Sequence, residues 1–86
     1  MHYVYLLQSL SRPDQRYTGL TDDLRSRLAK HNEGGVPHTS KFVPWELRTY
    51  IAFSERSQAV KFERYLKSGS GRAFANRHLF VLSAPP

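Results

Sequence analysis

The absence of cysteine constrains the fold more than any other single feature of this sequence. Without thiols, the chain can be held together by neither a disulfide framework nor a zinc–thiolate site. Its 86 residues are enough for one domain. A domain of this size buries only roughly 60% of the surface of its unfolded chain, so its core must be compact. We expect one domain at residues 1–80 and a C-terminal tail at residues 81–86 that adds at most a brief extended segment.

Composition and charge suggest the kind of partner. Hydrophobic residues make up 40% of the chain and aromatic residues 13%, which is typical of a globular protein. Thirteen Lys and Arg against seven Asp and Glu give a formal charge of +6. This charge favours a nucleic-acid partner, because each neutralised phosphate releases counterions. The alternative is a basic protein that its charge merely keeps soluble.

Two further features concern the location of the protein. No apolar run approaches membrane-spanning length, so we expect no membrane partner. The segment Met1–Tyr5 lacks the basic-then-apolar layout of a signal peptide. The expected location is therefore the cytoplasm, in association with the nucleoid.

Three strands are expected in this domain. Aromatic enrichment and alternating polarity predict them at residues 3–7, 16–19 and 47–53. Pro13-Asp14 between the first two is a turn signal, which favours antiparallel pairing. Trp45, just before the third strand, is expected to anchor the core.

Three helices are expected, at residues 21–32, 55–68 and 72–77. Thr21 and Ser54 are the expected N-caps of the first two, because a hydroxyl oxygen can accept a hydrogen bond from an exposed amide. Gly34-Gly35 should end the first helix, and Gly69-Ser70-Gly71 should separate the second from the third. The predicted class is α+β, a small three-stranded and mainly antiparallel sheet flanked by two to three helices in the order β-β-α-β-α-α.

The first helix carries two basic residues beside its apolar stripe. Leu24, Arg27, Leu28 and His31 share one face at helical spacing. Leu24 and Leu28 should face the sheet, which leaves Arg27 and His31 along the edge of the stripe. A guanidinium there suits a phosphate, and a histidine one turn further on is a candidate proton carrier.

The second helix carries an acidic residue within its apolar stripe. Glu63 shares a face with Ala59, Phe62 and Leu66. Burying an unpaired carboxylate is costly, so Glu63 should be neutral, paired or metal-bound. Two interpretations remain open: a structural ion pair with Arg27, or a cleft that holds a cation and a phosphate.

Two short segments resemble the signature tripeptides of the GIY-YIG nucleases. They are Tyr3-Val4-Tyr5 and Tyr17-Thr18-Gly19. Residues 20–32 resemble the first helix of that family, and Phe62-Glu63 resembles its metal-binding segment. The likeness spans residues 3–78 and is strongest to small, stand-alone, single-domain members. Tyr3 replaces the glycine of the first tripeptide and Thr18 the isoleucine of the second, and both replacements occur in those members.

The resemblance implies roles for five side chains. Tyr5 and Tyr17 would line the active site, and Tyr17 is the one expected to help activate the attacking water. Arg27 would contact the scissile phosphate. Glu63 would be the sole protein ligand of a single Mg²⁺ or Mn²⁺. His31 would act in proton transfer or phosphate contact.

Other residues have weaker assignments. Gly19 would let the backbone turn closely out of the second strand. Asn76 lies near the position where some members carry an asparagine. Lys41 and Arg72 are candidates for contacting nucleic-acid phosphates. The glycine-rich segment Gly69-Ser70-Gly71 before Arg72 could bind a phosphate through its backbone, but we expect it to form a flexible linker.

The resemblance implies a metal-dependent endonuclease that hydrolyses DNA phosphodiester bonds, with a role in DNA repair or recombination. Two alternatives stay open: a non-catalytic nucleic-acid-binding module of the same fold, and a structural domain with an incidental ion pair. The sequence does not distinguish DNA from RNA or reveal the substrate structure. It is compatible with a monomer or a weak dimer, and with a protein partner that supplies specificity.

Overall fold

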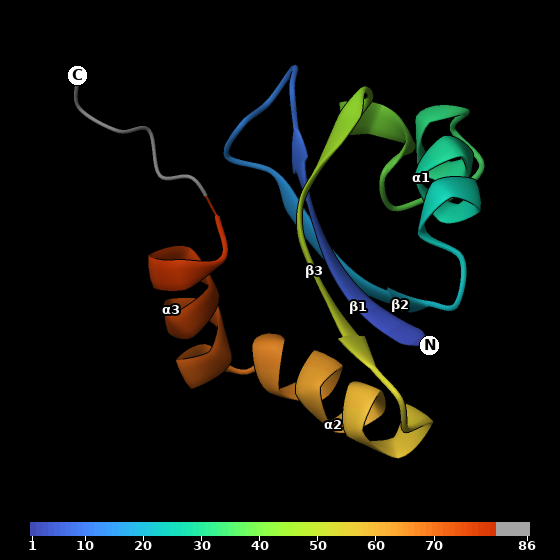
Figure 1. Cartoon of the computed structure of the whole chain (residues 1–86). Helices are drawn as coiled ribbons and strands as arrows, with labels where there is room; N and C mark the ends of the chain where they lie inside the picture. Colours follow the sequence, from blue (N-terminus) through green and yellow to red (C-terminus); the bar gives the residue numbers. More distant parts are fainter. Residues whose placement is uncertain (81–86) are drawn as a thin grey trace.

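The computed structural model describes residues 1–80, which form three strands, three α-helices and one short 3₁₀-helix (Figure 1). In chain order they are β1 (His2–Ser9), β2 (Arg16–Thr21), α1 (Leu24–Asn32), η1 (Ser40–Phe42), β3 (Trp45–Phe53), α2 (Arg56–Leu66) and α3 (Gly69–His78). This order confirms the predicted α+β class. The tail predicted at residues 81–86 lies outside the described residues.

The sheet is antiparallel, and its strand order is β2-β1-β3. The central strand β1 is buried from Val4 to Ser9. Helix α1 covers one face of the sheet, and α2 and α3 lie on the other (Figure 1). Because β1 has helices on both faces, it can place apolar side chains on both, which explains its nearly unbroken apolar run.

The face under α1 carries the first half of the core. Tyr5, Leu7 and Trp45 form a buried cluster there, against which Leu24 and Leu28 pack, as their spacing predicts. The indole Nε1 of Trp45 donates a hydrogen bond to the backbone carbonyl of Thr39 at 2.9 Å. Trp45 is therefore a core anchor, as expected.

The opposite face carries the second half of the core. Val4 and Leu6 pack there with Ala59 and Leu66 of α2 and Ala75 of α3. The apolar stripe predicted on the second helix is thus confirmed. Within residues 1–80, no helix combines the length and apolarity that crossing a membrane would require.

Both predicted N-caps were displaced along the chain. Thr21 is the last residue of β2, and its hydroxyl oxygen accepts a hydrogen bond from the amide of Asp23 at 3.1 Å. This local turn delays the helix, and Asp23 becomes the N-cap by accepting from the amide of Ser26. At α2 the N-cap is Glu55, not Ser54, and its side chain makes no capping hydrogen bond.

The glycine-rich segment after α2 is neither a break nor a flexible linker, contrary to expectation. Helix α3 starts at Gly69, and the Ser68 hydroxyl caps it by accepting from the amide of Gly71. A Cβ on Gly71 would collide with the backbone carbonyl of Tyr65. The glycine is needed because the backbones of α2 and α3 touch there. The capped Gly71 amide is also not free to bind a phosphate.

Candidate active site

Two tyrosines and a histidine gather beneath α1, brought there by three different elements. The ring centroids of Tyr5 on β1 and Tyr17 on β2 lie 6.1 Å apart, and those of Tyr17 and His31 lie 4.8 Å apart. Contrary to expectation, Gly19 does not turn the chain out of β2. It lies within that strand, opposite Tyr5. Its missing side chain leaves room for the Tyr5 ring.

The imidazole of His31 is held at both of its nitrogens. Its Nε2 lies 2.9 Å from the Tyr5 hydroxyl, and its Nδ1 lies 2.8 Å from the Thr39 hydroxyl. The Thr39 hydroxyl donates to the carbonyl of Val36, so it must accept from His31 Nδ1–H. In the neutral imidazole the other nitrogen carries no hydrogen, so Nε2 accepts from the Tyr5 hydroxyl. The hydrogen bond to Thr39 therefore selects the tautomer of the neutral ring.

The electrostatics agree with this assignment. Burial lowers the pKa of His31 below its ordinary value, and the nearby positive charge of Arg27 adds to the effect. Burial also raises the pKa of Tyr5 far above its ordinary value, followed by the influence of Tyr17. Both groups are therefore neutral at physiological pH.

This geometry bears on phosphate contact, one of the two roles expected for His31 beside proton transfer. The side chain is fully buried, and both nitrogens are engaged by Tyr5 and Thr39. Direct contact with a phosphate is therefore incompatible with the observed arrangement. His31 instead fixes the orientation of the Tyr5 hydroxyl, which leaves the lone pairs of that oxygen for other partners.

Arg27 borders this cluster from α1. It is half-buried, and its charge influences the pKa of both Tyr5 and His31. Throughout the described part of the chain, its guanidinium forms no ion pair and no side-chain hydrogen bond. An unpaired guanidinium beside two neutral side chains is available to an anionic ligand.

Glu63 does not form the structural ion pair with Arg27 that one interpretation required. The two residues belong to helices on opposite faces of the sheet (Figure 1). Glu63 pairs instead with Lys67 one turn along α2, at 2.6 Å. Its side chain is only 17% exposed, and its charge contributes to the raised pKa of Tyr5. The carboxylate therefore lies within electrostatic range of the tyrosine cluster.

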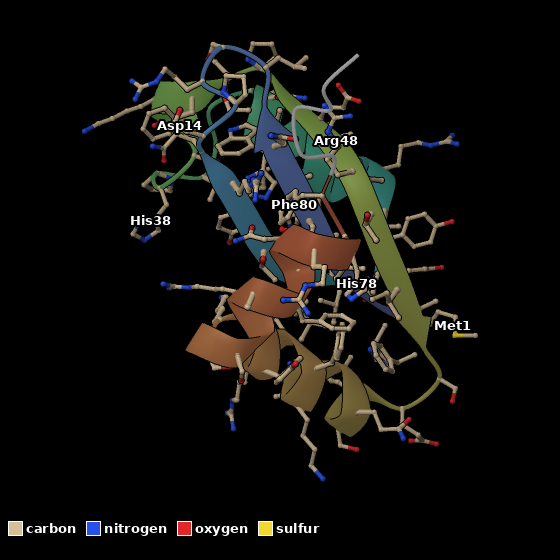
Figure 2. The ribbon with its side chains drawn as sticks, turned by 90° about the vertical axis from the view of Figure 1, so that its left-hand side faces the viewer. Met1, Asp14, His38, Arg48, His78 and Phe80 are labelled. Atoms are coloured by element: carbon tan, nitrogen blue, oxygen red, sulfur yellow. The ribbon has the colours of Figure 1, made fainter. Side chains whose placement is uncertain are left out.

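A cleft of about 410 Å³ opens on the other face of the sheet, between β2 and the helices α2 and α3, and Tyr17 is among the residues that line it. Tyr17 belongs to both the buried cluster and the cleft. None of the other lining residues in the described chain is acidic, and they are Arg16, Thr18, Leu66, Lys67, Arg72, Ala75, Asn76 and Phe80. Figure 2 shows Phe80 in front of the sheet, beyond the end of α3.

The cleft unites some predicted residues with others that the sequence did not single out. Arg72 and Asn76 both line it, as does Arg16, whose guanidinium donates to the side-chain oxygen of Asn76. The Arg16 guanidinium also lies 4.4 Å from the ring centroid of Phe80. Lys41 lies apart, exposed on η1. In the sequence, the only indication that Arg16 belongs to the site was its place directly before the signature tyrosine Tyr17.

The ligands open to a divalent cation are few. Among residues 1–80, no three histidine and acidic side chains form a cluster that could hold a metal. Glu63 is a chemically suitable single ligand, because Mg²⁺ retains several waters and accepts one or two carboxylates. Lys67 is its competitor, and that side chain is 53% exposed. An ion pair so open to solvent is weak, so a cation can replace the ammonium group.

Paired tyrosine strands, an arginine-bearing first helix and a glutamate-bearing second one define a class of protein. The family model described as the GIY-YIG catalytic domain matches residues 1–77, and the chain belongs to that family. It therefore carries a nuclease-type domain.

Among individual proteins, the chain is similar to small stand-alone members of the family. It is 35% identical over 68 residues to a UPF0213 protein of Halobacterium salinarum, which covers 78% of this chain and 86% of that protein. A UPF0213 protein of Bacillus halodurans, solved by NMR in solution, superposes with a TM-score of 0.53 at 30% identity. That match covers 88% of this chain and 82% of the other.

The chain is also similar to part of a larger protein. It is 34% identical over 86 residues to the structure-specific endonuclease subunit SLX1 of Malassezia globosa. The match covers 95% of this chain but only 18% of that protein. The two kinds of relative share one domain, and most of the larger protein lies outside the comparison.

Proposed function

We propose that this chain is a metal-dependent endonuclease that hydrolyses DNA phosphodiester bonds. The observation that carries the proposal is the position of Tyr17. Its ring packs against those of Tyr5 and His31, and the residue also lines the cleft that contains Arg16, Lys67 and Arg72. Membership of the GIY-YIG family supports the same reaction class.

The two tyrosines have different parts in the proposed reaction. The raised pKa of Tyr5 and its hydrogen bond to His31 keep its hydroxyl protonated, so it serves to position other groups. Tyr17, in its deprotonated phenolate form, is then the group that accepts the proton of the attacking water, directly or through a further water, and becomes the neutral phenol. The free guanidinium of Arg27 stabilises the negative charge that develops on the phosphate.

Glu63 would hold a single Mg²⁺ or Mn²⁺ in place of its ion pair with Lys67. When bound, such an ion acts as a Lewis acid on phosphate oxygens and stabilises the leaving group. The low exposure of Glu63 supports this assignment, since a nearly buried carboxylate satisfied by one surface lysine remains available to a stronger cation.

A role in DNA repair or recombination is part of the proposal. It is supported by the similarity to SLX1, which is named as a subunit of a structure-specific endonuclease. A protein partner that supplies specificity is proposed on the same ground. Cytoplasmic location in association with the nucleoid follows from the proposed substrate.

Labelled duplex, nicked, flap and branched DNA incubated with Mg²⁺ or Mn²⁺ tests the proposal. Wild-type protein should cleave at least one of them, and Glu63→Gln and Arg27→Ala should each lose about 100-fold or more in rate. The matched control is Glu33→Gln, since Glu33 is an exposed acid at the end of α1. Equal activity in all four proteins would indicate a contaminant and end the proposal.

The alternative is a binding module without catalysis, which the basic cleft alone would also suit. Anisotropy measured on the same DNA panel without metal separates the two. Glu63→Gln should bind DNA at least as tightly as wild type, because it removes a negative charge. DNA binding with no cleavage under any metal condition would favour the binding module.

A further inference from the structure

The cleft beside Tyr17 contains a clamped arginine. The Arg16 guanidinium donates to Asn76 on α3, and the Phe80 ring lies against it at 4.4 Å. Its Nε atom is buried and has no hydrogen-bond partner within residues 1–80. Buried donors in folded proteins are almost always satisfied, so an unpartnered one calls for an acceptor from elsewhere. A ligand oxygen or ring nitrogen in the cleft would supply it once the Phe80 ring shifts off the guanidinium.

The rest of the cleft has two chemically different parts. Lys67 and Arg72 supply positive charge, and the lining within the described chain includes no acidic side chain. Phe80, Leu66 and Ala75 supply apolar surface. A volume of about 410 Å³ is within the range of small-ligand sites. An anion alone would need only the basic part, whereas a flat ring attached to a phosphate would use both.

We propose that the cleft binds one unpaired nucleotide of the substrate. Its phosphate lies on Lys67 and Arg72, and its base lies against Phe80 with an acceptor facing Arg16. This proposal deepens the nuclease function proposed above and rests on it. Tyr17 lines the cleft and packs against the ring of Tyr5, so a nucleotide in the cleft would lie close to the proposed active site.

The arrangement has a consequence for the class of substrate. A base that is paired and stacked in a duplex cannot enter a cleft between β2 and two helices, so the nucleotide must leave the stack. Leaving is least costly where the nucleotide is already unpaired. The cleft therefore selects DNA with an unpaired nucleotide beside the cleavage position.

Metal-free NMR titration of the ¹⁵N-labelled chain tests the proposal. Three ligands are compared: deoxyadenosine monophosphate, 2-deoxyribose 5-phosphate and inorganic phosphate. The nucleotide should shift the amides of Thr18, Arg72 and Asn76, and should bind at least about fivefold more tightly than the sugar phosphate, since base stacking on aromatic side chains contributes at least that much.

Two leucine substitutions complete the test. Phe80→Leu keeps an apolar side chain at the edge of the core and should bring the nucleotide down to the affinity of the sugar phosphate. Phe74→Leu is the matched control, because Phe74 is an exposed aromatic outside the cleft, stacked between Tyr65 and His78. It should leave both affinities unchanged, and thermal unfolding verifies that both variants are folded.

Equal affinity of the wild-type chain for the nucleotide and the sugar phosphate would overturn the proposal, as would equal effects of the two leucine variants. Neither experiment needs metal or cleavage. Loss of the base preference alongside Glu63-dependent cleavage would therefore refute only the nucleotide site. A base preference in a chain that cleaves nothing would instead refute the nuclease function.

Discussion

Gly19 and Tyr5 face each other across the β1–β2 ladder, and a Cβ on Gly19 would lie 2.5 Å from the hydroxyl oxygen of Tyr5. The second signature tripeptide therefore needs a glycine at this position, because any side chain there would collide with the tyrosine of the first tripeptide. Its absent side chain lets the Tyr5 ring reach across β2 and place its hydroxyl on His31. Backbone conformation is not the reason, since Gly19 adopts ordinary strand geometry.

Gly19→Ala should displace the Tyr5 ring and break its hydrogen bond to His31. Overpacking of this kind costs about 1–3 kcal/mol in unfolding free energy. Chemical denaturation measures that loss, and cleavage should fall with it. Gly69→Ala is the matched control, because a Cβ there meets nothing within 4 Å. If the two variants were equally stable, the steric explanation of the tripeptide would be wrong.

His31 should make the stability of the fold depend on pH. Burial lowers its folded-state pKa below the ordinary value of 6.5. As pH falls, the unfolded chain takes up this proton before the folded chain does, so protonation favours unfolding. The contribution of neutral His31 is complete above pH 6.5 and is lost as pH falls towards the folded-state pKa. Melting temperatures measured between about pH 8 and about pH 5, roughly 1.5 units either side of the ordinary pKa, should show the decline.

His31→Gln removes the titrating group but can still hydrogen-bond Tyr5 and Thr39. Its melting temperature should therefore change less than that of wild type over the same pH range. His38→Gln is the control, because His38 is exposed and lies outside the cluster. A wild-type decline that survives His31→Gln unchanged would assign the pH dependence to other groups.

The parts of this molecule that local spacing encodes could be predicted from the sequence. Helical periodicity placed Leu24 and Leu28 against the sheet and Glu63 in the apolar stripe of α2, as the structure shows. Cap positions were missed because competing local hydrogen bonds decide them, as at Thr21. A glycine is also ambiguous in sequence: Gly71 was interpreted as a breaker, although close contact between two helices requires it.

The cleft could not be predicted, because it depends on contacts between distant segments. Arg16 and Asn76 are 60 residues apart, and they meet only through the tertiary fold, which brings α3 beside β2. Phe80 lies beyond the last helix and has no periodic neighbour to mark it. The Tyr5–His31 hydrogen bond likewise joins a strand to a helix end, which spacing alone does not bring together.

Lys67→Met should raise the affinity of the chain for Mn²⁺. The substitution keeps much of the apolar stem but removes the ammonium group that pairs with Glu63 at 2.6 Å. Freed from this competitor, the carboxylate should bind the ion about 3- to 5-fold more tightly, as expected for the loss of one partly exposed ion pair. Electron paramagnetic resonance of free Mn²⁺ measures the change without DNA, so the place of Lys67 in the cleft does not affect the result.

Arg64→Met is the control, since Arg64 lies on the same helix and is exposed. It should leave Mn²⁺ affinity within about twofold of wild type, because Arg64 has no ion pair within residues 1–80 and an exposed charge acts only through screened electrostatics. An affinity that rises equally in both variants would reflect general loss of positive charge and would argue against Glu63 as the ligand.

The two signature tyrosines should respond differently to loss of their hydroxyls. Tyr5→Phe leaves the buried Nε2 of His31 without its donor, which should cost about 1–3 kcal/mol of unfolding free energy. Tyr17→Phe should change stability by less, yet lower the cleavage rate by about 100-fold or more, because it removes the proposed proton acceptor. Denaturation and single-turnover cleavage, measured on both variants, separate the effects. If Tyr5→Phe lost cleavage while keeping full stability, the proton acceptor would be Tyr5, and the assignment of the two roles would be reversed.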